Sequence, residues 1–258
     1  MVDVYNKNGE LIEEGIRKAL FLEEQEKQVI CMIGGGGKST MVEALAKDYA
    51  KEEAVICTTT TKIMAPRYGS LLLEEDMEQL EELIKRGNSI VTIARQWNER
   101  KLTGVSETFL KHVMEQYPIL LIEADGSKGL PSKVPNETEP VIPKETTMVL
   151  GIQGIDAYHR PIKEVCHRPE LVAALLKKKE DEPLTAEDMA ELFLNPKALR
   201  KHCEGKAYWA VIQKVDTEKR MEWAKEISSC LQKRGFDRIL ITKRQEENAV
   251  LDRKDDFK

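Results

Sequence analysis

The run of four glycines followed by lysine, serine and threonine at residues 34–40 constrains the fold more than any other part of the sequence. An apolar segment at 29–33 precedes it, and an amphipathic pattern begins at Lys38. Glycines between a buried strand and a helix are typical of phosphate-binding loops, because the N–H groups and dipole at a helix N-terminus attract negative charge. Glycine also lets the backbone approach a phosphate closely. The sequence therefore predicts a nucleoside-triphosphate site at this loop.

The loop spacing matches the short pattern G-x-x-G-K-[ST], as in loops of the Mur-ligase type, because Met32 stands where the longer common pattern has its first glycine. We expect Lys38 to reach the β- and γ-phosphates and the Ser39 hydroxyl to bind Mg²⁺. The alternative is a glycine-rich turn with an incidental lysine, which the strand-to-helix context disfavours. The predicted nucleotide-binding residues of the loop are Gly34, Gly35, Gly36, Gly37, Lys38, Ser39 and Thr40.

Two acids, Glu123 and Asp125, end the apolar segment 119–122. In an extended strand their side chains project to the same side. One carboxylate is a candidate ligand of Mg²⁺, directly or through water, and the other is a candidate for orienting a nucleophile. The sequence does not rank the two acids. The alternative is a solvated strand end with a turn after Asp125.

Four further polar residues are weaker candidates for contacts to substrate or phosphate. Thr60 follows a predicted strand, and ligands of open α/β sheets lie beyond the carboxyl ends of strands; the alternative is the β-propensity of threonine. Lys128 and Lys133 are candidates for an anionic partner, although solvated lysines are the simpler interpretation, above all for Lys133. Arg168 is a candidate for stabilising developing negative charge, or it only precedes a helix that starts at Pro169.

The segment Gln213–Asp216 follows an apolar run and resembles the N-K-x-D element with which GTPases read guanine. Lys214 and Asp216 are the predicted base-contacting residues. Glutamine replaces the usual asparagine, so guanine is only slightly favoured and the choice between ATP and GTP stays open. The alternative is a strand-to-helix turn with Asp216 or Thr217 as the helix N-cap.

Apolar runs alternate with amphipathic segments, which predicts βαβ units in a mostly parallel sheet with helices on both faces. We expect one α/β domain of the P-loop NTPase type over residues 1–258. It would carry an N-terminal helix at about 9–24, a helical insert at about 156–205 and a charged tail at about 243–258. Predicted strands lie at 29–33, 54–57, 90–94, 119–122, 148–152, 208–212 and 238–241, and predicted helices start at Lys38 or span 74–86, 107–116, 169–178, 185–193 and 217–234.

Composition narrows the class of protein further. The 258 residues carry a formal net charge of −5, which gives no general reason to bind nucleic acid or a membrane surface. We expect neither a secretion signal nor a membrane span. The five cysteines are scattered without a C-x-x-C pair, which argues against a disulfide framework or a structural zinc site. A cytoplasmic location fits these features best.

Several motifs in their order along the chain resemble the selenium-dependent hydroxylase accessory proteins of the YqeC family, also called selenium cofactor biosynthesis proteins. The resemblance runs from about residue 29 to 242. The motifs are G-G-G-G-K-S-T (34–40), T-T-T-T-K-I (58–63), I-E-A-D-G-S-K-G-L-P (122–131), E-P-V-I-P (139–143), G-I-D-A (154–157), H-R-P-E (167–170) and Q-K-V-D (213–216).

The resemblance implies a P-loop protein that helps to make or insert the selenium cofactor of a molybdenum hydroxylase, with that enzyme or its cofactor as partner. We expect an accessory protein that uses Mg²⁺ with ATP or GTP, with Lys38, Glu123 and Asp125 as catalytic candidates. One alternative is a kinase or ligase that activates a small molecule with ATP. Another is a nucleotide-gated chaperone without catalysis.

Overall fold

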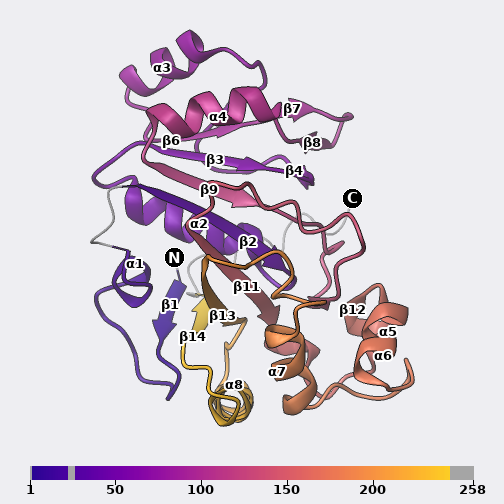
Figure 1. Ribbon diagram of the computed structural model, residues 1–258. Helices are drawn as coiled ribbons and strands as arrows, with labels where there is room; N and C mark the ends of the chain where they lie inside the picture. Colours follow the sequence, from indigo (N-terminus) through magenta and orange to yellow (C-terminus); the bar gives the residue numbers. More distant parts are fainter. Residues whose placement is uncertain (1, 23–26, 245–258) are drawn as a thin grey trace, which may run out of the picture.

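A nine-stranded sheet runs through the middle of the molecule, as Figure 1 shows for the computed structural model, which describes residues 2–22 and 27–244. All neighbouring strands are parallel except β1, which pairs antiparallel with β14 at one edge. The expected mostly parallel sheet is therefore confirmed. In spatial order the strands are β1 (Val2–Tyr5), β14 (Ile239–Arg244), β13 (Ala207–Gln213), β11 (Met148–Gly154), β2 (Gln28–Gly34), β9 (Ile119–Glu123), β3 (Val55–Thr59), β6 (Ile90–Ile93) and β5 (Ser70–Leu72).

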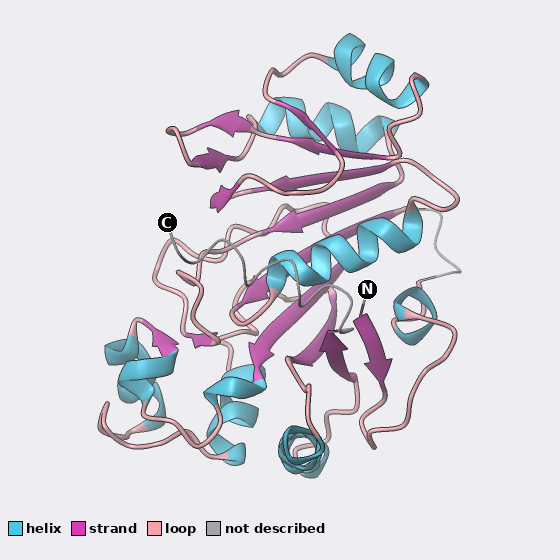
Figure 2. Ribbon diagram, turned by 180° about the vertical axis from the view of Figure 1, so that it is seen from behind, coloured by secondary structure: helices cyan, strands magenta, loops and turns pink. Residues whose placement is uncertain are grey.

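Helices cover both faces of this sheet, and Figure 2 shows α2 lying across the face turned towards the viewer. Side chains of β2 alternate between two apolar clusters: Val29 and Cys31 join one, while Ile30 and Met32 join the other. Burial on both faces explains why the central strands read as continuous apolar runs. The helices are α1 (Ile16–Ala19) and α2 (Lys38–Tyr49) on one face, and α3 (Met77–Lys85), α4 (Glu107–Gln116), α7 (Ala186–Leu194) and α8 (Glu218–Lys233) on the other.

The strand order places a topological switch point at β2. The chain leaves β2 through α2 on one face, whereas it leaves the neighbouring strand β11 towards α7 on the opposite face. A crevice at the carboxyl ends of the strands is where ligands bind in open α/β sheets with such a reversal. The glycine loop starts at the end of β2, so the fold puts it at this position.

The segment between β11 and β13, where the sequence predicts a helical insert at 156–205, combines short helices with irregular stretches. It begins with η1 (Ile155–Ala157) and α5 (Ile162–Val165) and continues with α6 (Pro169–Leu176) and α7. A capping box between Thr185 and Asp188 starts α7. The sequence did not predict two small sheets, which are β10 (Ser132–Lys133) with β12 (Cys166–His167), and β4 (Lys62–Met64), β8 (Lys101–Thr103) and β7 (Arg95–Gln96).

The predicted helix over residues 9–24 is wrong in extent, because only Ile16–Ala19 is helical among its described residues 9–22. Gly15 has a φ of 89° directly before it, which breaks any longer helix. Leu20 and Leu22 are buried as expected, but they reach the core from outside the helix. Residues 23–24 of the predicted helix and 245–258 of the predicted tail lie outside the described residues.

The described ranges contain no helix long and apolar enough to cross a membrane. All five cysteines are free and buried, so they form no disulfide framework.

Candidate functional site

The glycine loop is packed tightly against neighbouring backbone. Gly34, Gly36 and Gly37 have φ values of 98°, 78° and 137°, which favour glycine over every residue that has a side chain. A Cβ on Gly34 would lie 2.1 Å from the Ile152 carbonyl oxygen, and one on Gly36 would lie 2.4 Å from the Gly154 nitrogen. The close approach of β11 therefore requires these glycines, whether or not a ligand also does.

Beyond this contact the loop presents an array of unpaired N–H groups. The Gly34 amide donates to the Asp125 carboxylate at 2.9 Å, and the Gly35 amide donates to the Ile152 carbonyl at 2.9 Å. The N–H groups of residues 36–40 have no acceptor in the described chain, and the first helical bond runs from Met41 to Gly37. Such an array at a helix N-terminus is suited to oxyanions such as phosphate.

The Lys38 side chain folds back onto this loop and is buried. Its Nζ donates to the Gly34 carbonyl at 2.6 Å and lies 3.3 Å from Asp125 Oδ1. It also lies 3.4 Å from the Ser127 hydroxyl. An ammonium held beside five free amides is the pairing that a polyphosphate needs.

The side chain of Ser39, in the first turn of α2, faces the side chain of Glu123 at the end of β9. The Ser39 hydroxyl donates to Glu123 Oε1 at 2.7 Å. This contact follows from the sheet register, which puts Glu123 beside Met32, near the end of β2. Burial raises the pKa of Glu123 more than the positive charge of Lys38 and the hydrogen bond from Ser39 lower it. A buried carboxylate with a raised pKa gains from a bound cation.

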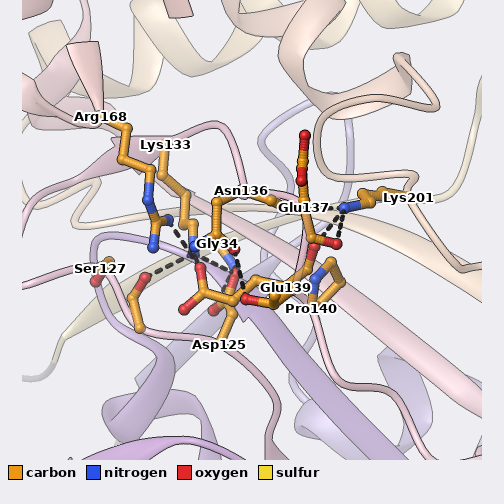
Figure 3. A network of polar contacts seen from close by, with 12 residues as sticks. Gly34, Asp125, Ser127, Lys133, Asn136, Glu137, Glu139, Pro140, Arg168 and Lys201 are labelled. Atoms are coloured by element: carbon orange, nitrogen blue, oxygen red, sulfur yellow. Dashed lines mark hydrogen bonds and ion pairs between the residues drawn. The ribbon is translucent and has the colours of Figure 1, made fainter. Parts of the chain in front are cut away.

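Asp125 takes part in a different set of contacts, shown in Figure 3. Besides Gly34 and Lys38, its carboxylate lies 3.1 Å from the Lys133 ammonium. Lys133 is fully buried and also donates to the Gly126 carbonyl at 2.6 Å. The interpretation of Lys133 as a solvated lysine is therefore wrong, because the fold surrounds it with acceptors.

The same network continues through Glu139 to the helical insert (Figure 3). Glu139 accepts hydrogen bonds of 2.8 Å from Lys133 and 2.8 Å from Arg168, the residue before α6. Burial alone would raise the pKa of Glu139, but these two cations lower it to about 2. Sequence reasoning missed Glu139 and the role of Lys133, and the only signal was the motif E-P-V-I-P that begins at Glu139.

Comparison with known proteins identifies the family. The model of the YqeC protein family matches residues 30–170, which is more than half of the chain. The chain belongs to the YqeC family. The matched range contains the glycine loop, Glu123, Asp125, Glu139 and Arg168, and it ends before the Q-K-V-D segment.

A relative within the YqeC family is the YqeC protein of Escherichia coli strain K12. It is 27% identical to this chain over 186 residues, which is 69% of the chain and 72% of the relative. No solved structure matches the chain.

In this YqeC-family chain, the hydroxyls of the three threonines at the end of β3 and just after it donate hydrogen bonds to backbone carbonyls. Thr58 donates to the Ile93 carbonyl, Thr59 to the Glu123 carbonyl and Thr60 to the Val141 carbonyl, at 2.8, 2.8 and 2.7 Å. These bonds fix the end of β3 against its neighbours. The structure therefore assigns the Thr60 hydroxyl a structural contact, and contact with phosphate stays a prediction.

Lys128 and Arg168, the other two substrate candidates, differ in their surroundings. Lys128 is exposed and has a φ of 52°, and no ion pair holds it within the described ranges. Arg168 is paired with Glu139, so its guanidinium is part of the buried network. Of the two, Lys128 has the ammonium accessible to an anion in solution.

The Q-K-V-D segment lies beside the glycine loop. A Cβ on Gly37 would lie 1.7 Å from Gln213 Oε1, and the Gln213 amide nitrogen is buried without a partner among the described residues. Lys214 pairs with Asp156 at 2.7 Å, and the exposed Asp216 pairs with Arg220 at 3.1 Å. Base contacts by Lys214 and Asp216 stay predictions, because both side chains have protein partners here.

Proposed function

We propose that the chain binds a magnesium-bound nucleoside triphosphate at residues 34–40 and transfers or hydrolyses the γ-phosphoryl group, as in the P-loop class. The observation that carries this proposal is the 2.7 Å hydrogen bond between Ser39 and Glu123 beside the free amides of residues 36–40. A hydroxyl, a carboxylate and a lysine at a helix N-terminus are the parts that P-loop proteins use around phosphates.

In this account the free amides hold the phosphate oxygens and Lys38 moves from Asp125 onto the terminal phosphates. Asp125 keeps the Gly34 amide and the buried Lys133, so its charge stays compensated when Lys38 leaves. Catalysis then depends on positioning and on electrostatic stabilisation of the charge that develops on the phosphoryl group. The remaining acid, Asp125, positions the loop and does not contact the substrate.

The donor set fits Mg²⁺, which prefers oxygen ligands and is commonly held by one or two carboxylates together with waters and substrate phosphates. Ser39 and Glu123 would hold it, because both Asp125 oxygens already accept hydrogen bonds or ion pairs. No group of three acidic, cysteine or histidine side chains suited to a metal occurs in residues 2–22 and 27–244. When bound, the ion would neutralise charge on the β- and γ-phosphates.

The test is hydrolysis of ATP and of GTP as a function of Mg²⁺ concentration, in the wild type and in Ser39→Ala. We expect one nucleotide to be hydrolysed, with kcat/KM at least about tenfold lower in the variant and a higher requirement for Mg²⁺. Ser228→Ala, a buried serine on α8, is the matched control and should behave as wild type. Hydrolysis that is independent of Mg²⁺, or unchanged in Ser39→Ala, would overturn the proposal.

We also propose, from the motif resemblance, that this activity serves maturation of a selenium-dependent molybdenum hydroxylase. Loss of hydroxylase activity in cells that carry Lys38→Ala, restored by the wild-type chain, would support this role. Unchanged hydroxylase activity would refute this role, but it would not affect the proposal of a nucleotide site. A nucleotide-gated chaperone would instead bind nucleotide tightly, turn it over very slowly and retain the hydroxylase in pull-downs.

A further inference from the structure

The turn at residues 127–130 lies directly against the glycine loop. The Leu130 N–H donates to the Ser127 carbonyl at 3.0 Å, which closes this four-residue turn. A Cβ on Gly35 would lie 2.4 Å from the Leu130 carbonyl oxygen, so the end of the turn touches the loop. At the start of the turn, the Ser127 hydroxyl lies 3.4 Å from the Lys38 ammonium. Both ends of the turn are therefore held beside the proposed phosphate site.

Lys128 adopts a backbone conformation in this turn that lysine rarely takes. The two central residues, Lys128 and Gly129, have φ values of 52° and 78°. A turn with positive φ at both central residues favours asparagine, aspartate or glycine, because a larger side chain is strained there. Glycine meets this requirement at the second position, whereas lysine does not meet it at the first. Strain of this kind is concentrated at functional sites, which favours a role for the Lys128 side chain.

The Lys128 ammonium is exposed and has no acid partner in residues 2–22 and 27–244. The neighbouring cations differ from it in this respect. Lys133 is buried between Asp125 and Glu139, and Arg168 donates to Glu139 at 2.8 Å. Removing either cation would leave a carboxylate without its partner, which costs free energy. Lys128, by contrast, can move onto an anion without breaking an ion pair.

The position of Lys128 brings its ammonium within reach of a bound triphosphate. Consecutive Cα atoms lie about 3.8 Å apart, so Lys128 starts next to the residue that contacts the Lys38 ammonium. Its flexible four-carbon stem then extends from the turn. Phosphoryl transfer develops negative charge around the γ-phosphorus, and a cation that contacts this group more closely in the transition state than in the ground state raises kcat.

We infer that Lys128 is a catalytic residue that contacts the γ-phosphoryl group in the transition state, an inference that rests on the nucleotide site proposed above. In hydrolysis, a water oxygen forms a bond to the γ-phosphorus, and the bond from that phosphorus to the β–γ bridging oxygen breaks. The electron pair of the broken bond stays on the nucleoside diphosphate. One proton of the water remains on the inorganic phosphate and the other passes to solvent, while Lys128 keeps its protons and contributes only charge.

The test measures hydrolysis of ATP and GTP at saturating Mg²⁺ in the wild type, Lys128→Asn and Lys128→Arg. Asparagine suits the positive φ and removes the charge. Lys128→Asn should therefore raise Tm by about 2–4 °C and lower kcat at least about tenfold, while the Kd for nucleotide stays within about twofold. Lys128→Arg keeps the charge and should retain most of the kcat. A purely structural lysine would not combine a higher Tm with a lower kcat.

Lys177→Asn is the matched control, because Lys177 is exposed directly after α6 and has a φ of 56°. It should raise Tm by a similar amount and leave hydrolysis unchanged. An unchanged kcat in Lys128→Asn, in an assay where Ser39→Ala lowers kcat/KM, overturns this inference alone. Nucleotide binding without hydrolysis in the wild type also overturns it and leaves the binding site standing. If the wild type binds neither nucleotide, the proposed function and this inference fall together.

Discussion

The Ser39 hydroxyl and the Glu123 carboxylate lie 2.7 Å apart although 84 positions separate them in the chain. Parallel pairing of β2 with β9 brings them together, because it aligns the ends of the two strands. Asp125, two residues further on, reaches the other side of the glycine loop and contacts Gly34. Two acids that look equivalent in the sequence therefore have different surroundings, and only Glu123 faces the helix hydroxyl.

Glu123→Gln is expected to stabilise the protein at high pH when neither Mg²⁺ nor nucleotide is present. Burial raises the pKa of Glu123 above its ordinary value of 4.5, so the folded state holds the proton more tightly than the unfolded state. The wild type therefore loses unfolding free energy as pH rises from the ordinary pKa of 4.5 to the raised pKa of the folded state. The Glu123→Gln variant has no ionisable group there and avoids this loss. Urea unfolding at pH 4 and pH 8 measures it, and a variant less stable than wild type at pH 8 would refute the prediction.

Glu139→Gln is expected to have the opposite pH dependence. The pKa of Glu139 is about 2 in the folded protein, against an ordinary value of 4.5. Its ionised form stabilises the folded state above pH 4.5, and this contribution disappears as pH falls towards 2. The variant should lose about 3 kcal/mol of unfolding free energy at pH 7. Urea unfolding between pH 2 and pH 7 tests this prediction, with the exposed Glu137→Gln as control. An equal loss of unfolding free energy at pH 3 and pH 7 would argue against a contribution from the ion pairs.

Gly36→Ala is expected to disrupt the loop more than a glycine replacement elsewhere. Gly36 and Gly129 both have a φ of 78°, so alanine pays the same backbone cost of about 1–2 kcal/mol at each. A Cβ meets the Gly154 backbone at Gly36, whereas nothing lies within 4 Å at Gly129. Thermal unfolding should therefore show a lower Tm for Gly36→Ala than for Gly129→Ala. Equal Tm values would contradict this prediction and would show that the loop adjusts to the added methyl group without loss of stability.

The core strands were predictable because each is a short apolar run with both faces buried. β1 was not, since Val2–Tyr5 is short and owes its place to antiparallel pairing with β14 at the sheet edge. The prediction of a helix at 9–24 was wrong in extent for a related reason. Leu20 and Leu22 do face the core but Leu11 is exposed, and periodicity alone does not show that the chain ahead of Gly15 is non-helical.

The glycine loop and the two acids were also identifiable as a candidate site, because their chemistry is local to a strand end and a helix start. The ionic network of Asp125, Lys133, Glu139 and Arg168 was not identifiable from the sequence. Burial of Lys133 depends on Asp125 and Glu139, which approach it only in the folded chain. Pairing of Arg168 with Glu139 likewise joins segments 29 residues apart. Sequence patterns contain the charges but not the distances that decide whether a lysine is solvated or buried.

Calorimetric titration of ATP, GTP and their diphosphates, with Mg²⁺, into the wild type and Lys38→Ala decides whether residues 34–40 are a nucleotide site. We expect the wild type to bind one nucleotide, with affinity at least about tenfold lower in Lys38→Ala because a charged hydrogen bond to phosphate is lost. Lys85→Ala, an exposed lysine on α3, should bind as wild type does. If the wild type binds none of the four nucleotides, the glycines serve only the close packing against β11 and the proposed function falls.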